Sequence, residues 1–235
     1  MEQNRPYIIC HMVTSIDVKV TGDFLSRPEA EPATEVYYQI NRDCKPDAFA
    51  CGRVTMEGSF TQGWYPDLSA FQGTILPRDD YVADSEAKFF AVAFDRRGRL
   101  GWKTSRISDE DPGYDNAHII EVLCEDAPDA YLAYLRSIGV SYLFAGEKDL
   151  DLSSALKKLK ELFGIEKLLL EGGSLLNGAF QREQVIDELS LVVAPVVAAA
   201  EDKPLFDASA MDGYVLQQIK QYENSVFWLN YAHTE

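Results

Sequence analysis

Short apolar runs of strand length alternate along this chain with segments that have the spacing of amphipathic helices, and this alternation restricts the possible folds most strongly. The apolar runs span residues 7–13, 47–52, 88–94, 118–124, 142–146, 167–171 and 186–197. The helical segments span residues 33–43, 53–58, 127–138, 153–163 and 174–181. Alternating strands and helices predict an α/β fold, and strands that are apolar at nearly every position are typical of a mostly parallel sheet.

Two segments near the C-terminus, 214–222 and 226–233, have no helix between them and are predicted to pair as an antiparallel hairpin at the sheet edge. The thirty or so residues after 58 are rich in Gly, Pro, Asp and aromatic residues, which predicts a long loop that is functional or mobile. The sequence contains no internal repeat, low-complexity segment or linker. We therefore expect one domain over residues 1–235.

The charge of the chain argues against several classes of partner. A formal net charge of -16 disfavours general electrostatic binding of nucleic acid or of an anionic membrane surface. No apolar run approaches the ~18 residues of a membrane span, and the N-terminus lacks the apolar core of a signal peptide, so a cytoplasmic location is expected. The four cysteines form no C-x-x-C pair, and with three scattered histidines they show no zinc-site spacing, so no metal is predicted.

A glycine-rich turn joins the predicted strand 167–171 to the helix that follows it. The strand ends at Glu171, two glycines follow, and the helix starts at Ser174. Glycines allow a ligand's phosphates to approach the backbone, and a helix N-terminus offers unpaired N–H groups. The pattern is not G-x-G-x-x-G, so it indicates either a dinucleotide phosphate site or a tight turn with an N-cap.

Two other strand ends carry polar residues of similar character. Gly52 joins the second strand to a helix on which Arg53 and Thr55 offer a cation and a hydroxyl to a phosphate; the alternative is a surface arginine and a capping threonine. The first strand runs into Thr14, Ser15 and Asp17, and Asp17 is either a ligand-side carboxylate or a turn residue. In open α/β sheets ligands bind beyond the carboxyl ends of the strands, which favours a common site.

Taken together, these segments resemble the C-terminal reductase domain family of riboflavin biosynthesis, pyrimidine reductases with a dihydrofolate-reductase-like fold. The points of resemblance, in the family's order, are 5–9 with 15–17, 52–55, 94–96, 170–173, 185–189 and 194–197. The resemblance covers nearly the whole chain. It implies a three-layer α/β fold with a mostly parallel central sheet and an antiparallel C-terminal edge hairpin, and a stand-alone reductase with no preceding deaminase domain.

The resemblance also implies an activity. The family uses NADPH to reduce the ribosylamino side chain of a pyrimidine phosphate, by hydride transfer to C1′, which leaves an open ribityl chain. The expected activity is that of a 5-amino-6-(5-phosphoribosylamino)uracil reductase or of the enzyme acting on the equivalent diamino-pyrimidinone. A small-molecule pyrimidine substrate and a homodimer are the expected partners.

Site residues follow from positions that match the family's contacts. The predicted cofactor contacts are Val13, Gly52, Arg53, Thr55, Arg96, Gly172, Gly173, Ser174, Leu175 and Leu176, within a stretch that runs on to residue 179. Arg96 follows a strand end and is expected to meet the 2′-phosphate, unless it is only a solvated surface arginine. Asp17 and Glu171 match the substrate side and are predicted to orient the substrate or relay a proton. Arg42 matches a substrate-contacting arginine after a one-residue gap.

The chain departs from the family's pattern at several positions. Asp-Val-Lys at 17–19 replaces the usual Asp-Gly-Lys, and His11 stands where the family often has lysine or asparagine. Residues 56–77 contain no Lys or Arg to meet a substrate phosphate, and offer Trp64 and Tyr65, which suit stacking on a flat ring. Two alternatives therefore stay open: a dihydrofolate-reductase-like enzyme with another substrate, and a non-catalytic NADPH-binding protein.

Overall fold

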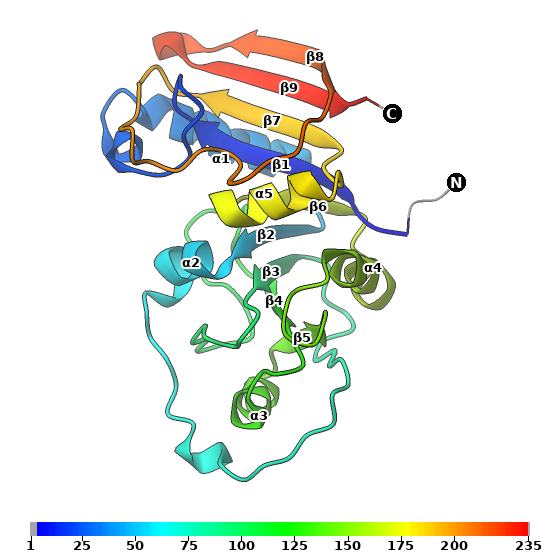
Figure 1. Cartoon of the computed structure of the whole chain (residues 1–235). Helices are drawn as coiled ribbons and strands as arrows, with labels where there is room; N and C mark the ends of the chain where they lie inside the picture. The colour runs from blue at the N-terminus through cyan, green and yellow to red at the C-terminus, as the bar shows by residue number, and fades with distance from the viewer. Residues whose placement is uncertain (1–3, 235) are drawn as a thin grey trace. The chain divides into compact units, whose positions relative to one another are not determined.

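The computed structural model describes residues 4–234, which form two compact units (Figure 1). Unit 1 contains residues 4–6 and 47–168, and unit 2 contains residues 7–46 and 169–234. Strand β6 (Lys167–Leu170) spans the boundary between the two stretches of sequence. The expectation of a single domain over 1–235 stays a prediction.

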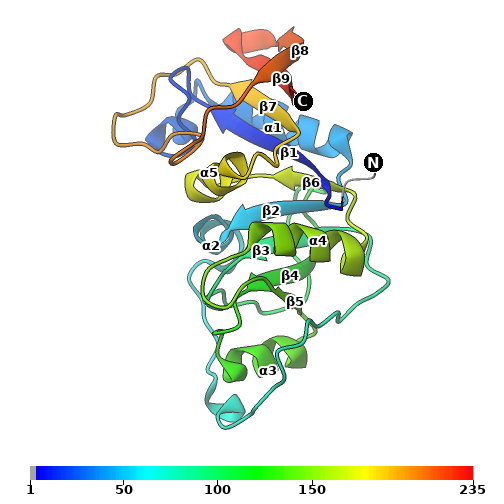
Figure 2. The same ribbon diagram turned by 45° about the vertical axis from the view of Figure 1, so that its right-hand side comes forward.

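Unit 1 is built on a parallel sheet of the predicted kind. The strands β2 (Ala48–Gly52), β3 (Phe90–Phe94), β4 (His118–Leu123) and β5 (Ser141–Phe144) pair in that order, all in parallel (Figure 2). Their residues are buried almost without exception, which explains why the sequence shows continuous apolar runs and no alternation.

The helices of unit 1 are α2 (Arg53–Met56), α3 (Asp129–Ser137) and α4 (Leu152–Phe163). The carboxylate of Asp151 caps α4 by accepting the N–H of Ser154 at 2.9 Å, and Gly164 ends the helix at φ +67°. Between α2 and β3 the chain makes one π-turn, η2 (Glu57–Thr61), and one 3-10 turn, η3 (Ser69–Phe71). The rest of residues 62–89 is irregular, which confirms the predicted loop.

Unit 2 combines a parallel strand pair with the predicted hairpin. β1 (Tyr7–Thr14) pairs in parallel with β7 (Glu188–Val193), which pairs in antiparallel with β9 (Phe227–His233); β9 pairs with β8 (Tyr214–Gln221). The hairpin turn is η4 (Glu223–Ser225), at the predicted residues. The strand predicted over 186–197 was too long, because β7 ends before Pro195, which has no N–H to extend the ladder.

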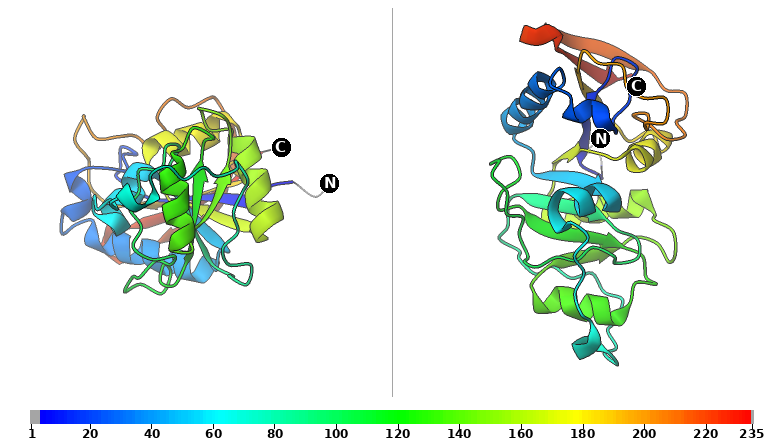
Figure 3. Two further views of the ribbon diagram at one scale, coloured as in Figure 1. Left: turned by 90° about the horizontal axis from the view of Figure 1, so that it is seen from below. Right: turned by 90° about the vertical axis from the view of Figure 1, so that its left-hand side faces the viewer.

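Two helices cover this sheet. α1 (Glu31–Cys44) packs on β1 and β7, and Figure 3 shows α1 and α5 (Ser174–Arg182) on opposite sides of the sheet. α1 begins earlier than predicted because Pro32 fits its first turn. The core beneath α1 includes Val13, Ala33 and Val192.

Candidate active site

The glycine-rich turn of unit 2 has the backbone that its sequence predicts. Gly172 lies at φ +104°, where a side chain would be strained, and a Cβ on it would lie 3.2 Å from the Cε atom of Met12. The peptide bond between Gly172 and Gly173 is cis. Gly173 is the N-cap of α5, and no side chain caps the helix there. The tight turn of the alternative interpretation is therefore present, and a phosphate site at the same helix start stays a prediction.

Buried polar atoms without partners surround the same helix start. The Ser174 hydroxyl is buried and makes no hydrogen bond within residues 4–234. The side-chain amide of Asn177, one turn further on, is fully buried and equally unpaired among those residues. Leu175 is 63% exposed and Leu176 is half-buried. Because unpaired buried polar groups cost free energy, this combination fits a ligand that brings hydrogen-bonding atoms and some apolar surface.

Glu171, which precedes these glycines, is buried and held by a neighbour that the sequence did not reveal. Its carboxylate accepts a 2.7 Å hydrogen bond from the side-chain amide of Asn41 on α1. The other amide atom, Asn41 Oδ1, is buried and has no hydrogen bond within residues 4–234. Arg42, the predicted substrate arginine, is half-buried and donates to Gln39 at 3.3 Å. The structure thus brings Asn41, next to the predicted residue, into contact with Glu171.

Asp17 has a very different environment from Glu171. It is exposed, and its Oδ1 accepts the N–H of Ala198 at 3.0 Å and the hydroxyl of Ser15 at 2.7 Å. These hydrogen bonds, that from Ala198 first, hold the pKa of Asp17 below its ordinary value. Asp17 is therefore a poor proton donor near neutral pH.

Val18 occupies a backbone position that suits glycine. Its φ is +60°, and the turn around it is closed by hydrogen bonds from Val18 N–H to the Ser15 carbonyl and from Ser15 N–H to the Lys19 carbonyl, both 3.0 Å. A β-branched residue is strained in this region. The glycine of the usual Asp-Gly-Lys pattern would adopt this φ without strain, whereas the exposed Val18 side chain gains little packing in return.

His11 and Val13, on β1, are both buried inside unit 2. The His11 ring stacks on Tyr37 with centroids 4.4 Å apart, and its Nδ1 lies 2.9 Å from the Ser190 hydroxyl. Burial lowers the pKa of His11 to about 4, so this residue does not replace the lysine of other family members as a cation. The Val13 side chain belongs to the core, which leaves its backbone for any cofactor contact.

Unit 1 holds the other predicted cofactor residues. Gly52 is the extended N-cap of α2, and Arg53 forms an ion pair with Glu57 at 2.6 Å. Thr55 is half-buried on the same short helix. Arg96, at the end of β3, forms an ion pair with Asp149 and is 38% exposed, so it is neither buried nor freely solvated. Arg53 and Arg96, each in an ion pair, and the Thr55 hydroxyl therefore stay the predicted phosphate contacts of unit 1.

The aromatic pair after α2 is already engaged by the protein. The Tyr65 ring stacks on Tyr131 with centroids 6.0 Å apart, and its hydroxyl donates to the Gly98 carbonyl at 3.0 Å. The ammonium of Lys103 lies 5.4 Å from the centroid of the Trp64 ring. Each ring therefore has one protein partner, and stacking on a substrate is left as a prediction.

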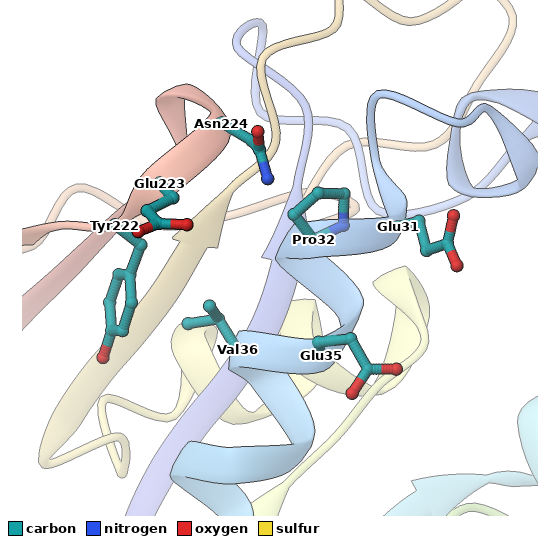
Figure 4. A pocket seen from close by; sticks show the side chains of 7 residues that line it. All are labelled: Glu31, Pro32, Glu35, Val36, Tyr222, Glu223 and Asn224. Atoms are coloured by element: carbon teal, nitrogen blue, oxygen red, sulfur yellow. The ribbon is translucent and has the colours of Figure 1, made fainter.

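A groove of about 620 Å³ in unit 2, between the start of α1 and the end of β8, does not have the character of a phosphate site (Figure 4). Val36 points toward Tyr222, while Glu35 points away from it. The groove is lined by Glu31, Pro32, Glu35, Val36, Tyr222, Glu223 and Asn224. Three carboxylates and no cation among these residues disfavour an anionic ligand.

No group of three or more His, Cys, Asp or Glu side chains within residues 4–234 is arranged to hold a metal ion. No helix in the same range is long and apolar enough to cross a membrane. The four cysteines, all within residues 4–234, form no disulfide, and Cys10 and Cys51 are buried.

Comparison with known families gives the site its context. The model of the RibD C-terminal domain matches residues 6–227. The chain belongs to the RibD C-terminal domain family. It is 27% identical over 210 residues to a 2,5-diamino-6-ribosylamino-4(3H)-pyrimidinone 5′-phosphate reductase of Methanothermobacter thermautotrophicus, covering 88% of this chain and 87% of that protein. An Archaeoglobus fulgidus protein of the same name is 21% identical over 213 residues, with 85% of each chain covered.

Solved structures of RibD proteins share the fold. Acinetobacter baumannii RibD (form 1) matches with a TM-score of 0.68 and 21% identity over 100% of this chain, which spans 60% of the RibD chain. A pyrimidine reductase-like protein of Corynebacterium diphtheriae matches with a TM-score of 0.68 and 18% identity, covering 99% of this chain and 93% of the other. The riboflavin biosynthesis reductase Rib7 of Saccharomyces cerevisiae matches with a TM-score of 0.63 and 13% identity, covering 100% of this chain and 92% of the other. These matches confirm the predicted dihydrofolate-reductase-like α/β fold.

Proposed function

We propose that this chain is an NADPH-dependent reductase of 2,5-diamino-6-ribosylamino-4(3H)-pyrimidinone 5′-phosphate or of its amino-uracil equivalent. The observation that carries the proposal is the match to the Methanothermobacter reductase over 88% of this chain and 87% of that protein. The family model, which matches residues 6–227, includes every predicted site segment. A nicotinamide cofactor follows from the reductase family. Its identity as NADPH rests on Arg96.

The residues present fit a bound dinucleotide. In unit 2 the proposed cofactor contacts are the first turn of α5, residues 172–176, and the backbone of Val13; the unpaired Ser174 hydroxyl and uncapped helix start supply donors for phosphate oxygens. In unit 1 the proposed contacts are Gly52, Arg53, Thr55 and Arg96. When bound, the nicotinamide supplies a hydride.

Glu171 and Asp17 lie in different environments, and we assign them different roles toward the substrate. Reduction at C1′ adds a hydride to that carbon, and the sugar ring opens, so the ring oxygen takes a proton. Glu171 is buried and oriented by Asn41, and we assign it the proton-handling role on the substrate. Asp17 is exposed and has a lowered pKa, so we assign it substrate orientation through its charge. Arg42 is proposed as a contact to the substrate's anionic side.

The decisive experiment follows NADPH oxidation with the diamino-pyrimidinone substrate and with the amino-uracil form. We expect turnover of at least one, and we expect Glu171→Gln to reduce kcat by about 10²-fold or more, the usual contribution of a general acid–base group. The exposed Glu147→Gln serves as a control with the same change of charge. Turnover of neither substrate by the wild-type protein would falsify the assignment.

A second candidate function is favoured by two observations, the strained Val18 and the absence of Lys and Arg from residues 56–77. Both affect the substrate side and leave the cofactor residues intact. The candidate is a dinucleotide-binding protein of this family with another substrate or with none. Quenching of tryptophan fluorescence by NADPH, without turnover of either pyrimidine, would support it; turnover of dihydrofolate or another imine would identify a different substrate.

The C-terminal hairpin is the surface we propose for a homodimer. β8 is the last strand of the unit 2 sheet among the described residues, and it is exposed along nearly its whole length. Apolar side chains stand out on the hairpin: Val215, Leu216 and Ile219 on β8 and Phe227 on β9. An exposed edge strand with apolar side chains is unfavourable for a monomer and suits pairing with a second copy. We expect the wild-type protein to sediment as a dimer and Ile219→Lys to sediment as a monomer. If Ile219→Lys is still a dimer, the interface does not lie on this hairpin.

A further inference from the structure

Residues 96–99 form a loop that carries three arginines, Arg96, Arg97 and Arg99, and is here called the arginine loop. Hydrogen bonds to the rest of unit 1 constrain its backbone. The Gly98 carbonyl accepts a hydrogen bond from the Tyr65 hydroxyl at 3.0 Å. The buried carboxylate of Asp95 accepts the N–H of Leu100 at 2.7 Å, just after the loop. The half-exposed Tyr65 thus anchors the loop at Gly98, and the buried Asp95 anchors the chain just after it, which constrains the backbone that carries the three arginines.

One of these arginines already has an anionic partner inside the protein. The Arg96 carbonyl accepts the N–H of Cys124 at 3.0 Å, and its guanidinium forms an ion pair with Asp149. Asp149 lies in a tight turn, because Gly146 at φ +94° comes so close that a Cβ on it would lie 2.1 Å from the Asp149 carbonyl oxygen. Asp151 then caps α4. Two fixed loops therefore hold the carboxylate of Asp149 against Arg96.

The ion pair stands where an external anion has access to it. The Asp149 side chain is 87% exposed and that of Arg96 is 38% exposed. The guanidinium groups of Arg97 and Arg99 are on exposed residues and form no ion pair within residues 4–234. A guanidinium binds carboxylate and phosphate in the same two-pronged geometry, and a phosphate monoester carries roughly −1.5 to −2 charges at neutral pH. A phosphate that binds the guanidinium of Arg96 must first replace the Asp149 carboxylate.

We propose that Asp149 sets the affinity of the protein for the 2′-phosphate of NADPH by competing with that phosphate for Arg96. The inference rests on the proposed function, because it takes NADPH as the ligand of the arginine loop. Asp149 is then a specificity-determining residue that weakens NADPH binding without touching the cofactor in the bound state. NADH lacks the phosphate, so its binding does not require the ion pair to break.

The test compares Asp149→Asn with the wild-type protein by isothermal titration calorimetry with NADPH, NADH and the fragment 2′,5′-ADP. An exposed ion pair has a modest strength, so we expect NADPH and 2′,5′-ADP to bind about two- to fivefold more tightly to Asp149→Asn, with no change for NADH. Added salt should reduce the gain. Glu147→Gln, two positions away, makes the same charge change at an exposed residue, and we expect its affinities for all three ligands to equal those of the wild-type protein.

The outcomes separate this inference from the proposed function. Equal NADPH affinity in Asp149→Asn and wild type, or an equal gain for NADH, overturns the role of Asp149 while the reductase assignment stands. If Glu147→Gln binds NADPH more tightly by the same factor, the effect comes from the net charge of the protein, and the role of Asp149 is again overturned. If the wild-type protein binds neither dinucleotide, the proposed function fails and the inference fails with it. Thermal unfolding of each variant confirms that the fold is retained.

Discussion

The side-chain amide of Asn41 donates a 2.7 Å hydrogen bond to the carboxylate of Glu171, across 130 positions of sequence. Both side chains are buried, so the bond fixes the direction of a carboxylate that stands directly before the glycine turn. A buried hydrogen bond to a charged group contributes about 1.5–3 kcal/mol. In the proposed reaction this pair would set the direction from which Glu171 meets the substrate.

We predict that Asn41→Ala lowers kcat by about tenfold or more and changes NADPH affinity by less than about twofold, since only the orientation of Glu171 is lost. Steady-state kinetics and a cofactor titration make the comparison. Glu35→Gln, an exposed change on the same helix that leaves Arg42 and its partner Gln39 intact, is the matched control. Unchanged kcat in Asn41→Ala would show that the hydrogen bond has no part in the reaction.

Arg96 provides the prediction on cofactor choice. We expect Arg96→Ala to weaken NADPH binding by about 10- to 100-fold while NADH binding changes little, because a charge-assisted hydrogen bond to phosphate is lost only with NADPH. Fluorescence titration with both dinucleotides measures this. Arg78→Ala removes another arginine of unit 1, one that is paired with Asp129, and should change the affinity for neither NADPH nor NADH. Equal losses for both cofactors would remove the assigned role of Arg96.

Local periodicity made most of the fold predictable. The helix and strand runs and the turn at 223–225 depend on residues a few positions apart, and the structure has most of them where the sequence placed them. The strand end before Pro195 was missed because the apolar run continues past the residue that stops the ladder. The proline itself was the signal.

Contacts between distant residues limited the prediction of the site. The positions of Glu171 and the glycines followed from the family pattern, but their partner Asn41 did not, because nothing near it in sequence identifies it. Its only signal was a polar side chain four positions after Tyr37, on the inward face of α1. The ion pair of Arg96 with Asp149 joins two loops 53 positions apart and was equally hidden.

Val18 gives a prediction on stability. A non-glycine residue at φ +60° costs roughly 1–3 kcal/mol, and glycine relieves this at an entropic cost of about 0.5–1 kcal/mol. We therefore expect Val18→Gly to raise the free energy of unfolding by about 1 kcal/mol in urea titrations. Val197→Gly, at an exposed valine without a positive φ, should lower it. A loss of stability in Val18→Gly would show that the valine side chain stabilises this turn.

Glu121 makes the stability of unit 1 depend on pH. It is fully buried on β4, and its carboxyl accepts hydrogen bonds from the Trp102 indole and, at 3.3 Å, from the Tyr131 hydroxyl. Burial, and then the charge of Asp95, raise the pKa of Glu121 well above its ordinary value. The folded protein thus holds this proton more tightly than the unfolded chain. Stability from the protonated form is complete below the unfolded pKa and is lost as the pH rises toward and through the folded pKa.

Glu121→Gln keeps the shape of the side chain and removes its titration, so we expect it to stabilise the protein more at about pH 8 than at about pH 5. For a chain of this size each ~1 kcal/mol gained raises Tm by about 2–4 °C, which calorimetry at the two pH values resolves. Glu147→Gln, at an exposed position, should show no such difference. Because groups that do not interact with Glu121 titrate equally in both proteins, the difference between variant and wild type reports Glu121 together with its charge coupling to Asp95. A constant difference in Tm across this pH range would mean that Glu121 is ionised in the folded protein and compensated by its two donors.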